Sequence, residues 1–250
     1  MLKKRLKYFS FNFLFSYLLI FLSSCLLASC VPKLAAPPLY RDRDLSLDEI
    51  ITLSRGNIHS LKTVVDINVE KDNRHYSSAA ASVLIKKPGL LQIRLYKFGM
   101  PVGNYLVRDK IMHVLSGRRN EKFREFGREL YYSVFWWEGL ENAVLRRNAS
   151  EYIIRTEGKE IRLDRATLLP ERQEIVTERG TIHILYDEPR KKNVPSLQDG
   201  PEGDFWYQSV IKIEIGAFRF TVTVEKLYMN PLFKENDFKL PEEIVETKGS

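Results

Sequence analysis

Residues 210–227, VIKIEIGAFRFTVTVEKL, contain two segments in which apolar and polar side chains alternate. Isoleucine occupies every second position from Ile211 to Ile215, and phenylalanine or valine does so from Phe218 to Val224. Because successive side chains of a strand point to opposite faces of a sheet, this period of two predicts two strands, each with one apolar face. Gly216-Ala217 lies between them and predicts a tight turn, so the stretch predicts an antiparallel hairpin.

The same pattern extends over much of the chain and predicts a single sheet. Clear alternation occurs in residues 63–70, TVVDINVE, and in residues 90–98, LLQIRLYKF. Further strand-like segments are ASVLIKK (81–87), NYLVRDKIMHVLS (104–116), EYIIRTE (151–157), KEIRLDR (159–165), RQEIVTE (172–178) and GTIHILYD (180–187). Their short connections favour an antiparallel meander, because parallel strands need long crossover connections.

Two segments depart from the strand pattern and predict helices. Ser46 and Glu49 form a capping box that predicts a short amphipathic helix ending at Arg55-Gly56. Residues 121–148, EKFREFGRELYYSVFWWEGLENAVLRRN, carry a dense aromatic cluster and predict a second helical segment around Phe135 to Leu145. An apolar sheet face must be covered, so we expect this segment to fold across the sheet over a packed core or a cavity. The polar residues 188–204 predict a long exposed loop.

The first thirty residues have the organisation of an export signal. The basic residues MLKKRLK are followed by a long apolar run that ends in Leu27-Ala28-Ser29-Cys30. This ending resembles the bacterial lipobox and predicts cleavage before Cys30 and lipidation of its thiol, rather than an uncleaved anchor. Leu22-Ser23-Ser24-Cys25 also fits the pattern, so Cys25 stays an alternative site. We expect a signal peptide at 1–29 and a proline-rich tether at 30–45, with acyl chains, palmitate among them, holding the protein on a membrane.

The composition is that of a folded protein and gives little support to a nucleic-acid partner. Hydrophobic residues make up 44% of the chain and charged residues 28%. The net charge of +7 falls to +3 when the four basic residues of 1–29 are removed (7 − 4 = 3). Such a small excess, in an exported protein, favours a solvated sheet face over a nucleic-acid surface. Val31, rather than Asp, after the lipidated cysteine favours the outer membrane by analogy.

The chain has no motif typical of an enzyme or a metal site. It contains neither H-E-x-x-H, nor a G-x-S-x-G nucleophile elbow, nor a P-loop. Four histidines are scattered without metal-ligand spacing, at His59, His75, His113 and His183. We therefore expect no catalytic residue, no metal, no cofactor and no enzymatic activity. A hydrolase whose carboxylate or Ser/His cluster is assembled by folding stays the third alternative.

One turn between two predicted strands is unusually apolar. Residues 97–105, KFGMPVGNY, contain glycine and proline at the expected bend from Gly99 to Gly103, yet they also present Met100 and Val102. Two interpretations are open: these side chains turn back into the core, or they form an exposed apolar tip that contacts lipid.

The chain resembles the LolA-like carriers and, more strongly, the LolB-like receptors of the outer-membrane lipoprotein-localisation family. The resemblance rests on the lipobox, the short N-terminal helix and three segments: SLKTVVDINVE (60–70), GLLQIRLYKFGMPVGNYLVRD (89–109) and FTVTVEKLYMNPLFKENDFKLP (220–241). It implies a mainly β (α+β) fold at 46–241, followed by a tail at 242–250. That fold is an incomplete antiparallel β-barrel with helices across its concave apolar face and a cavity for acyl chains. The polar stretch 188–204 departs from the family pattern.

The resemblance also implies a function without bond chemistry. The protein would lie on the outer membrane facing the periplasm, receive an acylated lipoprotein or lipid from a soluble periplasmic carrier, and pass it to the membrane. Met100 and Val102 match the membrane-insertion loop of LolB-like receptors. The alternation predicts the cavity-lining residues Val65, Ile67, Val69, Leu91, Ile93, Leu95, Phe135, Trp136, Ile213 and Phe220. The alternative is a structural or assembly lipoprotein with a filled interior.

Overall fold

The computed structural model describes residues 37–40, 44–55, 58–194 and 203–240. The predicted signal peptide at 1–29, both candidate lipidation sites, Cys30 and Cys25, the tether up to residue 36 and the tail at 242–250 lie outside the described residues. Those expectations therefore stay predictions.

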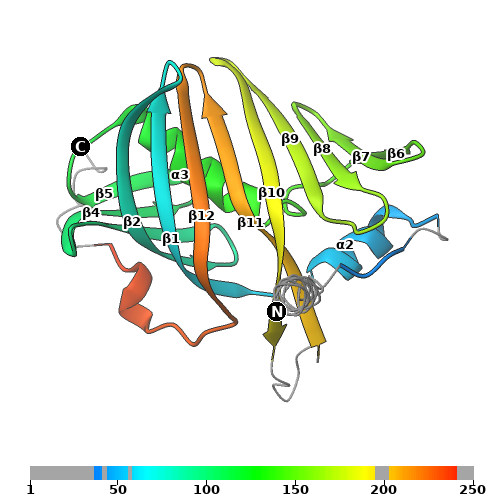
Figure 1. Ribbon diagram of the computed structural model, residues 1–250, viewed down its shortest axis with the longest axis horizontal. Coiled ribbons are helices and arrows are strands. Elements are labelled where there is room, and N and C mark those ends of the chain that lie inside the picture. Colours follow the sequence, from blue (N-terminus) through cyan, green and yellow to red (C-terminus); the bar gives the residue numbers. More distant parts are fainter. Residues whose placement is uncertain (1–36, 41–43, 56–57, 195–202, 241–250) are drawn as a thin grey trace, which may run out of the picture. The chain divides into compact units, whose positions relative to one another are not determined.

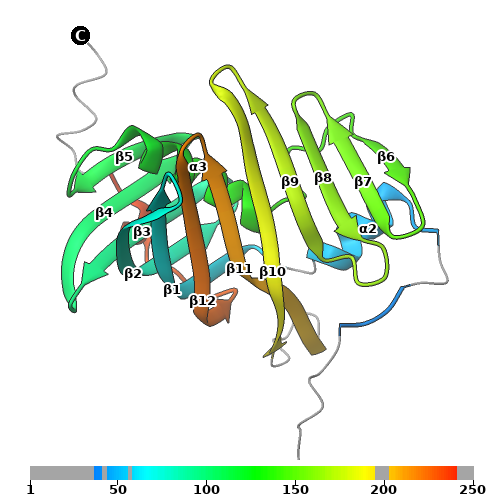
Figure 2. The same ribbon diagram turned by 45° about the horizontal axis from the view of Figure 1, so that its top comes forward.

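Twelve strands form one antiparallel sheet in the order β5-β4-β3-β2-β1-β12-β11-β10-β9-β8-β7-β6 (Figures 1 and 2). The strands are β1 (Ser60–Lys71), β2 (Arg74–Lys86), β3 (Leu90–Lys97), β4 (Met100–Arg108), β5 (Ile111–Ser116), β6 (Val144–Arg147), β7 (Glu151–Thr156), β8 (Lys159–Asp164), β9 (Pro170–Thr177), β10 (Gly180–Val194), β11 (Gly203–Ile215) and β12 (Phe218–Met229). The last strand, β12, pairs with the first, while β5 and β6 are the two edges. The sheet is therefore not closed, and the prediction of an incomplete antiparallel barrel is confirmed.

The hairpin at 210–227 has the predicted register. Ile213 pairs with Phe220 and Ile215 pairs with Phe218, on either side of the Gly216-Ala217 turn. On the neighbouring strand Ile67 pairs with Val222, so the apolar side chains of successive strands lie on the same face. This shared face runs across the sheet and holds most of the core.

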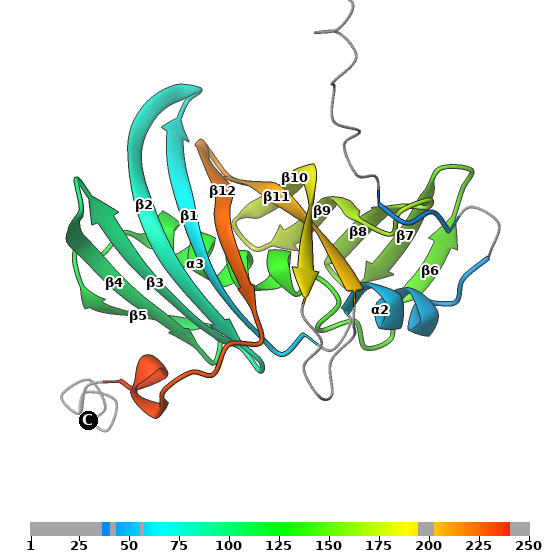
Figure 3. The same cartoon turned by 60° about the horizontal axis from the view of Figure 1, so that its bottom comes forward.

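Helix α3 (Glu121–Val134) crosses this apolar face and contacts β3, β5 and β11 (Figures 1 and 3). The Asn120 side chain caps its first turn by accepting a hydrogen bond from the backbone N–H of Phe123, at 3.2 Å. Phe126 and Leu130, one turn apart, are buried against the sheet. The predicted cover of the apolar face by a helix is thus confirmed.

The predicted position of this helix, around Phe135 to Leu145, is wrong. Helix α3 ends at Val134, and the chain leaves helical geometry at Phe135 (φ −102°, ψ 57°). Beyond the helix, Phe135 packs in the main core, whereas Trp136 packs in the separate cluster that contains Ile50, and Trp137 is half-buried. The turn at Phe135 allows these neighbouring rings to reach two different clusters. The chain then reaches β6 through turns.

Helix α2 (Leu47–Arg55) covers the other end of the sheet. The capping box is confirmed: the backbone N–H of Ser46 donates to Glu49 Oε2 at 2.8 Å, and the backbone N–H of Glu49 donates to Ser46 Oγ at 3.4 Å. Ile50 is fully buried in a cluster with Tyr152 and Ile154 of β7 and Ile161 of β8. Trp136 joins this cluster and links it to the segment after α3.

The expected loop at 188–204 is largely strand. Strand β10 continues to Val194 and β11 begins at Gly203, with Arg190 opposite Tyr207 and Lys192 opposite Phe205. Aromatic residues pack well across a strand pair, so β11 supplies partners for the polar half of β10. Residues 195–202 lie outside the described part of the chain. On the opposite face of β2 to β4, a short 3-10 helix, η1 (Glu235–Phe238), buries Phe238 against Leu84 and Leu106.

Candidate functional site

An apolar cavity of about 200 Å³ lies between the sheet and the segment that follows α3. The sheet contributes Leu61, Thr63, Ile85, Tyr186, Ile211, Val224 and Leu227. The opposite wall comprises residues 133–137, and Leu53 and Ser54 of α2 and residues 167–170 close another side. Pro38, Tyr40 and the aromatic start of β11 at 205–207 complete it. No charged side chain lines the cavity within the part of the chain that the structure describes.

The aromatic wall is fixed by contacts on both sides. The Trp137 ring meets the Phe135 ring edge-on, with centroids 5.7 Å apart, and meets the Trp136 ring in the same way at 5.4 Å. Lys87 Nζ lies 4.8 Å from the Phe135 ring centroid and 3.7 Å from Glu138 Oε1. These contacts hold the wall in one orientation.

Two tyrosines near the cavity stay neutral. The Tyr131 hydroxyl donates to Glu138 Oε2 at 2.6 Å, and its burial together with this carboxylate raises the pKa of Tyr131 above its ordinary value. The Tyr186 hydroxyl donates to the backbone carbonyl of Ser133 at 2.8 Å and accepts from Gln173 Nε2. Burial raises the pKa of Tyr186. The strand β10 is thereby tied to the end of α3.

The predicted cavity residues divide between two environments. Phe135 and Trp136 line the cavity. Val65, Ile67, Leu91, Ile93, Ile213 and Phe220 do not line it; they are buried in the core beneath α3, and Val69 and Leu95 are half-buried at the edge of that core. There the Phe126 ring of α3 stacks on the Phe220 ring, with centroids 4.5 Å apart and planes at 19°. The helix side chains fill this part of the interior.

The sequence analysis missed several residues of the cavity wall. Trp137, Tyr186, Trp206 and Gln208 line it but were not singled out as site residues. A signal existed in the sequence FWYQ at 205–208, where three successive aromatic residues break the alternation of β11. The prediction of an exposed loop up to residue 204 obscures the start of strand β11, which carries these residues.

The apolar hairpin is exposed, and its bend is sharper than predicted. A two-residue turn at Phe98 (φ 51°) and Gly99 (φ 76°) joins β3 to β4, so Met100, Pro101 and Val102 already belong to β4. The exposed fractions are 90% for Phe98, 63% for Met100 and 46% for Val102. The interpretation as a buried corner is therefore wrong. Positive φ at both central positions favours Asn-Gly, and a bulky Phe there is uncommon.

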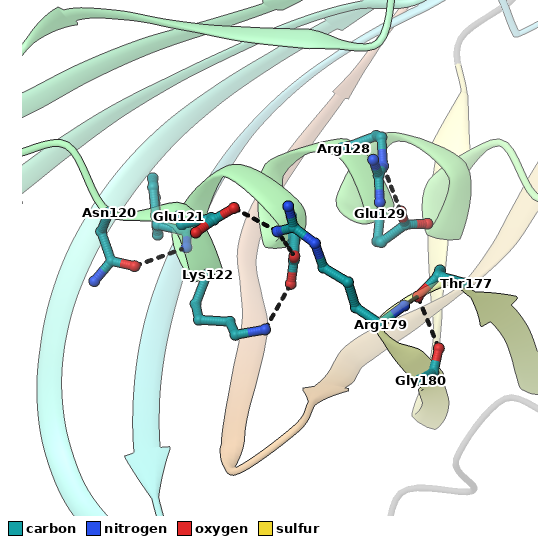
Figure 4. A network of polar contacts seen from close by, with 10 residues as sticks. Asn120, Glu121, Lys122, Arg128, Glu129, Thr177, Arg179 and Gly180 are labelled. Atoms are coloured by element: carbon teal, nitrogen blue, oxygen red, sulfur yellow. Dashed lines mark hydrogen bonds and ion pairs between the residues drawn. The ribbon is translucent and has the colours of Figure 1, made fainter.

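A second hollow, of about 780 Å³, lies between α3 and the β9–β10 hairpin and is charged. Arg179 of the hairpin reaches Glu121 and lies 3.0 Å from Glu125 Oε1, on the first turns of α3 (Figure 4). On the next turns Arg128 Nε donates to the buried Glu129 at 2.7 Å. Lys159 Nζ donates to the carbonyl of Trp136 at 3.3 Å, and burial lowers the pKa of Lys159 to about 8. This groove is unsuited to an acyl chain.

Two further properties concern the described residues as a whole. In these ranges no three His, Cys, Asp or Glu side chains are grouped as metal ligands would be. No helix within the described chain is both long enough and apolar enough to span a bilayer.

Solved structures of other proteins have a similar fold. The LolA superfamily protein NE2245 from Nitrosomonas europaea aligns with a TM-score of 0.55 and 11% identity, over 79% of this chain and 99% of that one. The chain therefore has a LolA-like fold. A DUF1329 family protein from Desulfovibrio piger aligns with a TM-score of 0.50 and 11% identity, over 77% of this chain and 92% of that one. No protein-family model and no curated protein matches the sequence. The LolA-like fold agrees with the resemblance found in residues 60–70, 89–109 and 220–241.

Proposed function

We propose that this protein is an outer-membrane lipoprotein, anchored through Cys30 and facing the periplasm, that binds an acyl chain in its apolar cavity. In this role it takes part in the transfer of lipoproteins or lipids to the outer membrane. The observation that carries the proposal is the cavity of about 200 Å³ with aromatic walls and no charged lining residue in the described chain. The LolA-like fold is compatible with this function but does not by itself establish it.

The energetics of uptake follow from burial of the chain. Each methylene group removed from water contributes about 0.8 kcal/mol. The cavity of about 200 Å³ exceeds the ~150 Å³ of a cavity known to bind benzene and is smaller than the roughly 300 Å³ of the smallest drug-sized pockets. The cavity therefore has room for part of one acyl chain. Release requires only that the membrane offers an apolar environment of equal quality, so the function needs no bond chemistry.

A larger cargo requires displacement of a wall. The side of the cavity next to the wall at 133–137 consists of short elements, namely α2, residues 167–170 and the chain at Pro38 and Tyr40. Leu53 of α2 is 47% exposed although it borders the cavity, so this side of the wall is thin. We expect the cavity to widen here when more than one acyl chain enters.

The Phe98–Val102 tip supports contact with a membrane. Phe98 occupies a turn position that disfavours it and is almost fully exposed, a combination that is typical of a functional rather than a structural residue. We expect Phe98→Asn to leave the unfolding midpoint unchanged or higher, because Asn suits positive φ, and to reduce delivery of cargo to vesicles. Leu232→Asn, at another fully exposed apolar residue, is the control and leaves delivery unchanged. Normal delivery by the Phe98 variant would contradict a role of the tip.

A structural or assembly role is the second candidate, and one observation favours it. The interior beneath α3 is packed, with Phe126 stacked on Phe220 and the predicted residues there buried in the core. A LolA-like fold with a mostly packed interior can act through its surface alone. Absence of any acyl binding would favour this candidate.

The experiment that tests the proposal follows cargo between proteins. A soluble carrier loaded with an acylated lipoprotein is mixed with the anchored protein in vesicles, and the position of the cargo is measured by chemical crosslinking. We expect transfer to the wild-type chain and reduced transfer to Val224→Phe, which fills the cavity from β12. Thr223→Phe, the neighbouring position on the opposite face, is the matched control. Equal transfer to both variants would contradict the proposal.

A further inference from the structure

Three exposed cations border the Phe98–Val102 tip. Lys97 precedes the tip and pairs with Met100 across the hairpin. Arg118 and Arg119 follow the end of β5, which lies beside the start of β4. Within the described residues, none of these three cationic side chains has an ion-pair or hydrogen-bond partner. Their charges are therefore available to a partner outside this chain.

A glycine brings the two arginines close to the tip. Gly117 has a positive φ of 98°, and a Cβ atom at this position would lie 2.9 Å from the carbonyl oxygen of Val102. The Tyr105 hydroxyl of β4 donates to the backbone carbonyl of Arg118 at 3.2 Å. The segment that carries the arginines is thus held against β4 beside the last residue of the tip.

The stability of α3 does not explain the position of the arginines. They lie immediately before Asn120, which caps the N-terminus of this helix, where the helix dipole favours negative charge and disfavours cations. The next acid along the chain, Glu121, is paired with Arg179 of the β9–β10 hairpin (Figure 4). Residues 96–107 and 114–120 contain neither Asp nor Glu. This end of β3 to β5 therefore combines exposed apolar side chains with positive charge.

We propose that the tip and the three cations together form a docking surface for a membrane that contains anionic phospholipid. The apolar side chains enter the acyl region, and the cations lie at the headgroup phosphates. This inference rests on the proposed function and specifies the lipid class at the delivery step. A two-residue hairpin turn presents little area to a protein, since a stable protein interface needs about 800 Å² on each partner. Apolar side chains flanked by cations suit a lipid interface.

The size of the expected effect follows from the number of cations. Each Lys or Arg beside an anionic membrane surface strengthens attachment roughly fivefold, and three do so on the order of 100-fold. Salt screens this attraction, because the charges lie at an exposed surface. The attraction should therefore depend on both the lipid headgroup and the ionic strength.

The test places an indole in the tip of the full chain. Phe98→Trp changes an almost fully exposed side chain, so we expect the fold to be retained. The anchored protein is placed in nanodiscs of phosphatidylcholine, or of phosphatidylcholine mixed with phosphatidylglycerol. Brominated acyl chains in both kinds of disc quench an indole that enters the bilayer, and the protein with only its three native tryptophans gives the background. We expect much stronger quenching with phosphatidylglycerol, and loss of this gain at high salt.

Charge variants in the Phe98→Trp protein separate the cations from the apolar tip. Arg118→Gln together with Arg119→Gln should lower the ratio of docked to free tip roughly 25-fold in discs with phosphatidylglycerol. Lys62→Gln together with Lys226→Gln removes the same charge at the other end of β1 and β12, and should keep the gain. Retention of the full gain by the arginine variant would overturn the inference.

The remaining outcomes distinguish this inference from the proposed function. Equal quenching in both kinds of disc would overturn the inference and leave contact of the tip with the membrane intact. No quenching of the introduced indole in either disc would also contradict the role of the tip in the proposed function. Poly-glutamate represents an acidic protein partner. A change of indole emission on its addition, without any gain from phosphatidylglycerol, would assign the surface to such a partner and overturn the inference.

Discussion

The space between the sheet and its covering segment is packed beneath α3 and forms a cavity beyond the end of this helix, although the same strands line both parts. On β11, Ile213 is buried in the packed part and Ile211, two residues earlier, borders the cavity. On β12, Phe220 and Val224 are divided in the same way. The strands are equivalent in pattern, so the covering segment decides whether the space above them is filled.

The geometry of the covering segment explains the difference. Within α3, Phe126 and Leu130 reach the sheet at successive turns and fill the space at regular intervals. After Val134, Phe135 packs in the main core and Trp136 in the cluster that contains Ile50, while the Trp137 ring meets both rings edge-on. Together the three rings form one wall of the cavity.

The largest expected effect tests the packed part. Phe126→Ala removes a fully buried ring and should lower the free energy of unfolding by about 3–5 kcal/mol, measured by urea denaturation. Phe205→Ala, at a half-buried ring that borders the cavity, should cost clearly less because no packed space is emptied. Equal losses would remove the distinction between the two regions.

Lys159 tests the boundary between the cavity wall and the charged groove. Its pKa is about 8 in the folded protein, against about 10.4 for an exposed lysine, so the unfolded chain binds more protons between these values. The free energy of unfolding should therefore rise as the pH increases from 8 towards 10. Lys159→Met should remove this slope and increase stability at pH 7 by about 2 kcal/mol.

Chemical denaturation at about pH 7.0, below the window set by the two pKa values, and at about pH 9.5, inside that window, measures both effects. Lys122→Met, at an ammonium on the exposed side of the same groove, is the control and should keep the slope. A variant at Lys159 that retains the full slope would show that another group causes it.

Enlarged side chains provide the third comparison. Ile93→Phe adds volume to the packed part and should destabilise the fold by about 1–3 kcal/mol. Val224→Phe adds volume beside the cavity and should cost less than about 1 kcal/mol, because free space accommodates the ring. Thermal unfolding of both variants measures the difference, and the reverse order would mean that the cavity is filled in solution.

The smallest effect concerns the contact that holds the first turns of α3 to the β9–β10 hairpin. Arg179→Gln removes its ion pairs with Glu121 and Glu125, and the exposed position makes the expected loss of stability small. The loss should shrink further at high salt, since salt screens exposed pairs. Arg155→Gln, at another exposed pair, on β7, is the control for general charge effects.

Alternation and turn residues were sufficient to predict the sheet, its antiparallel order and the need for a covering helix. They were not sufficient to predict the site. Ile211 and Ile213 are identical in the pattern, and only the path of residues 134–137 places one of them at a cavity. The sequence YYSVFWW contains neither proline nor glycine and so marks no end of the helix, whereas in the fold Phe135 and Trp136 pack in two different clusters.

Two further differences have the same origin in tertiary contacts. The polar residues 188–194 predict a loop, yet pairing with the aromatic start of β11 keeps them in a strand. The sequence predicts Met100 and Val102 as the tip, whereas the structure makes Phe98 the most exposed of the three, at a positive φ where a bulky side chain is uncommon. In both places tertiary contacts override the local conformational preference. Both places lie beside features, the cavity and the apolar tip, that we connect with the proposed function.

Pro38 and Tyr40 border the cavity, and the backbone N–H of Tyr40 donates to the carbonyl of Ala166 at 2.6 Å, next to the wall residues 167–170. Any mechanical force applied to the chain from before Pro37 therefore reaches this domain at the cavity wall rather than at the sheet. One hydrogen bond yields under load far more easily than a ladder of twelve paired strands. Tension in the chain before Pro37 would therefore displace the cavity wall before it loosened the sheet.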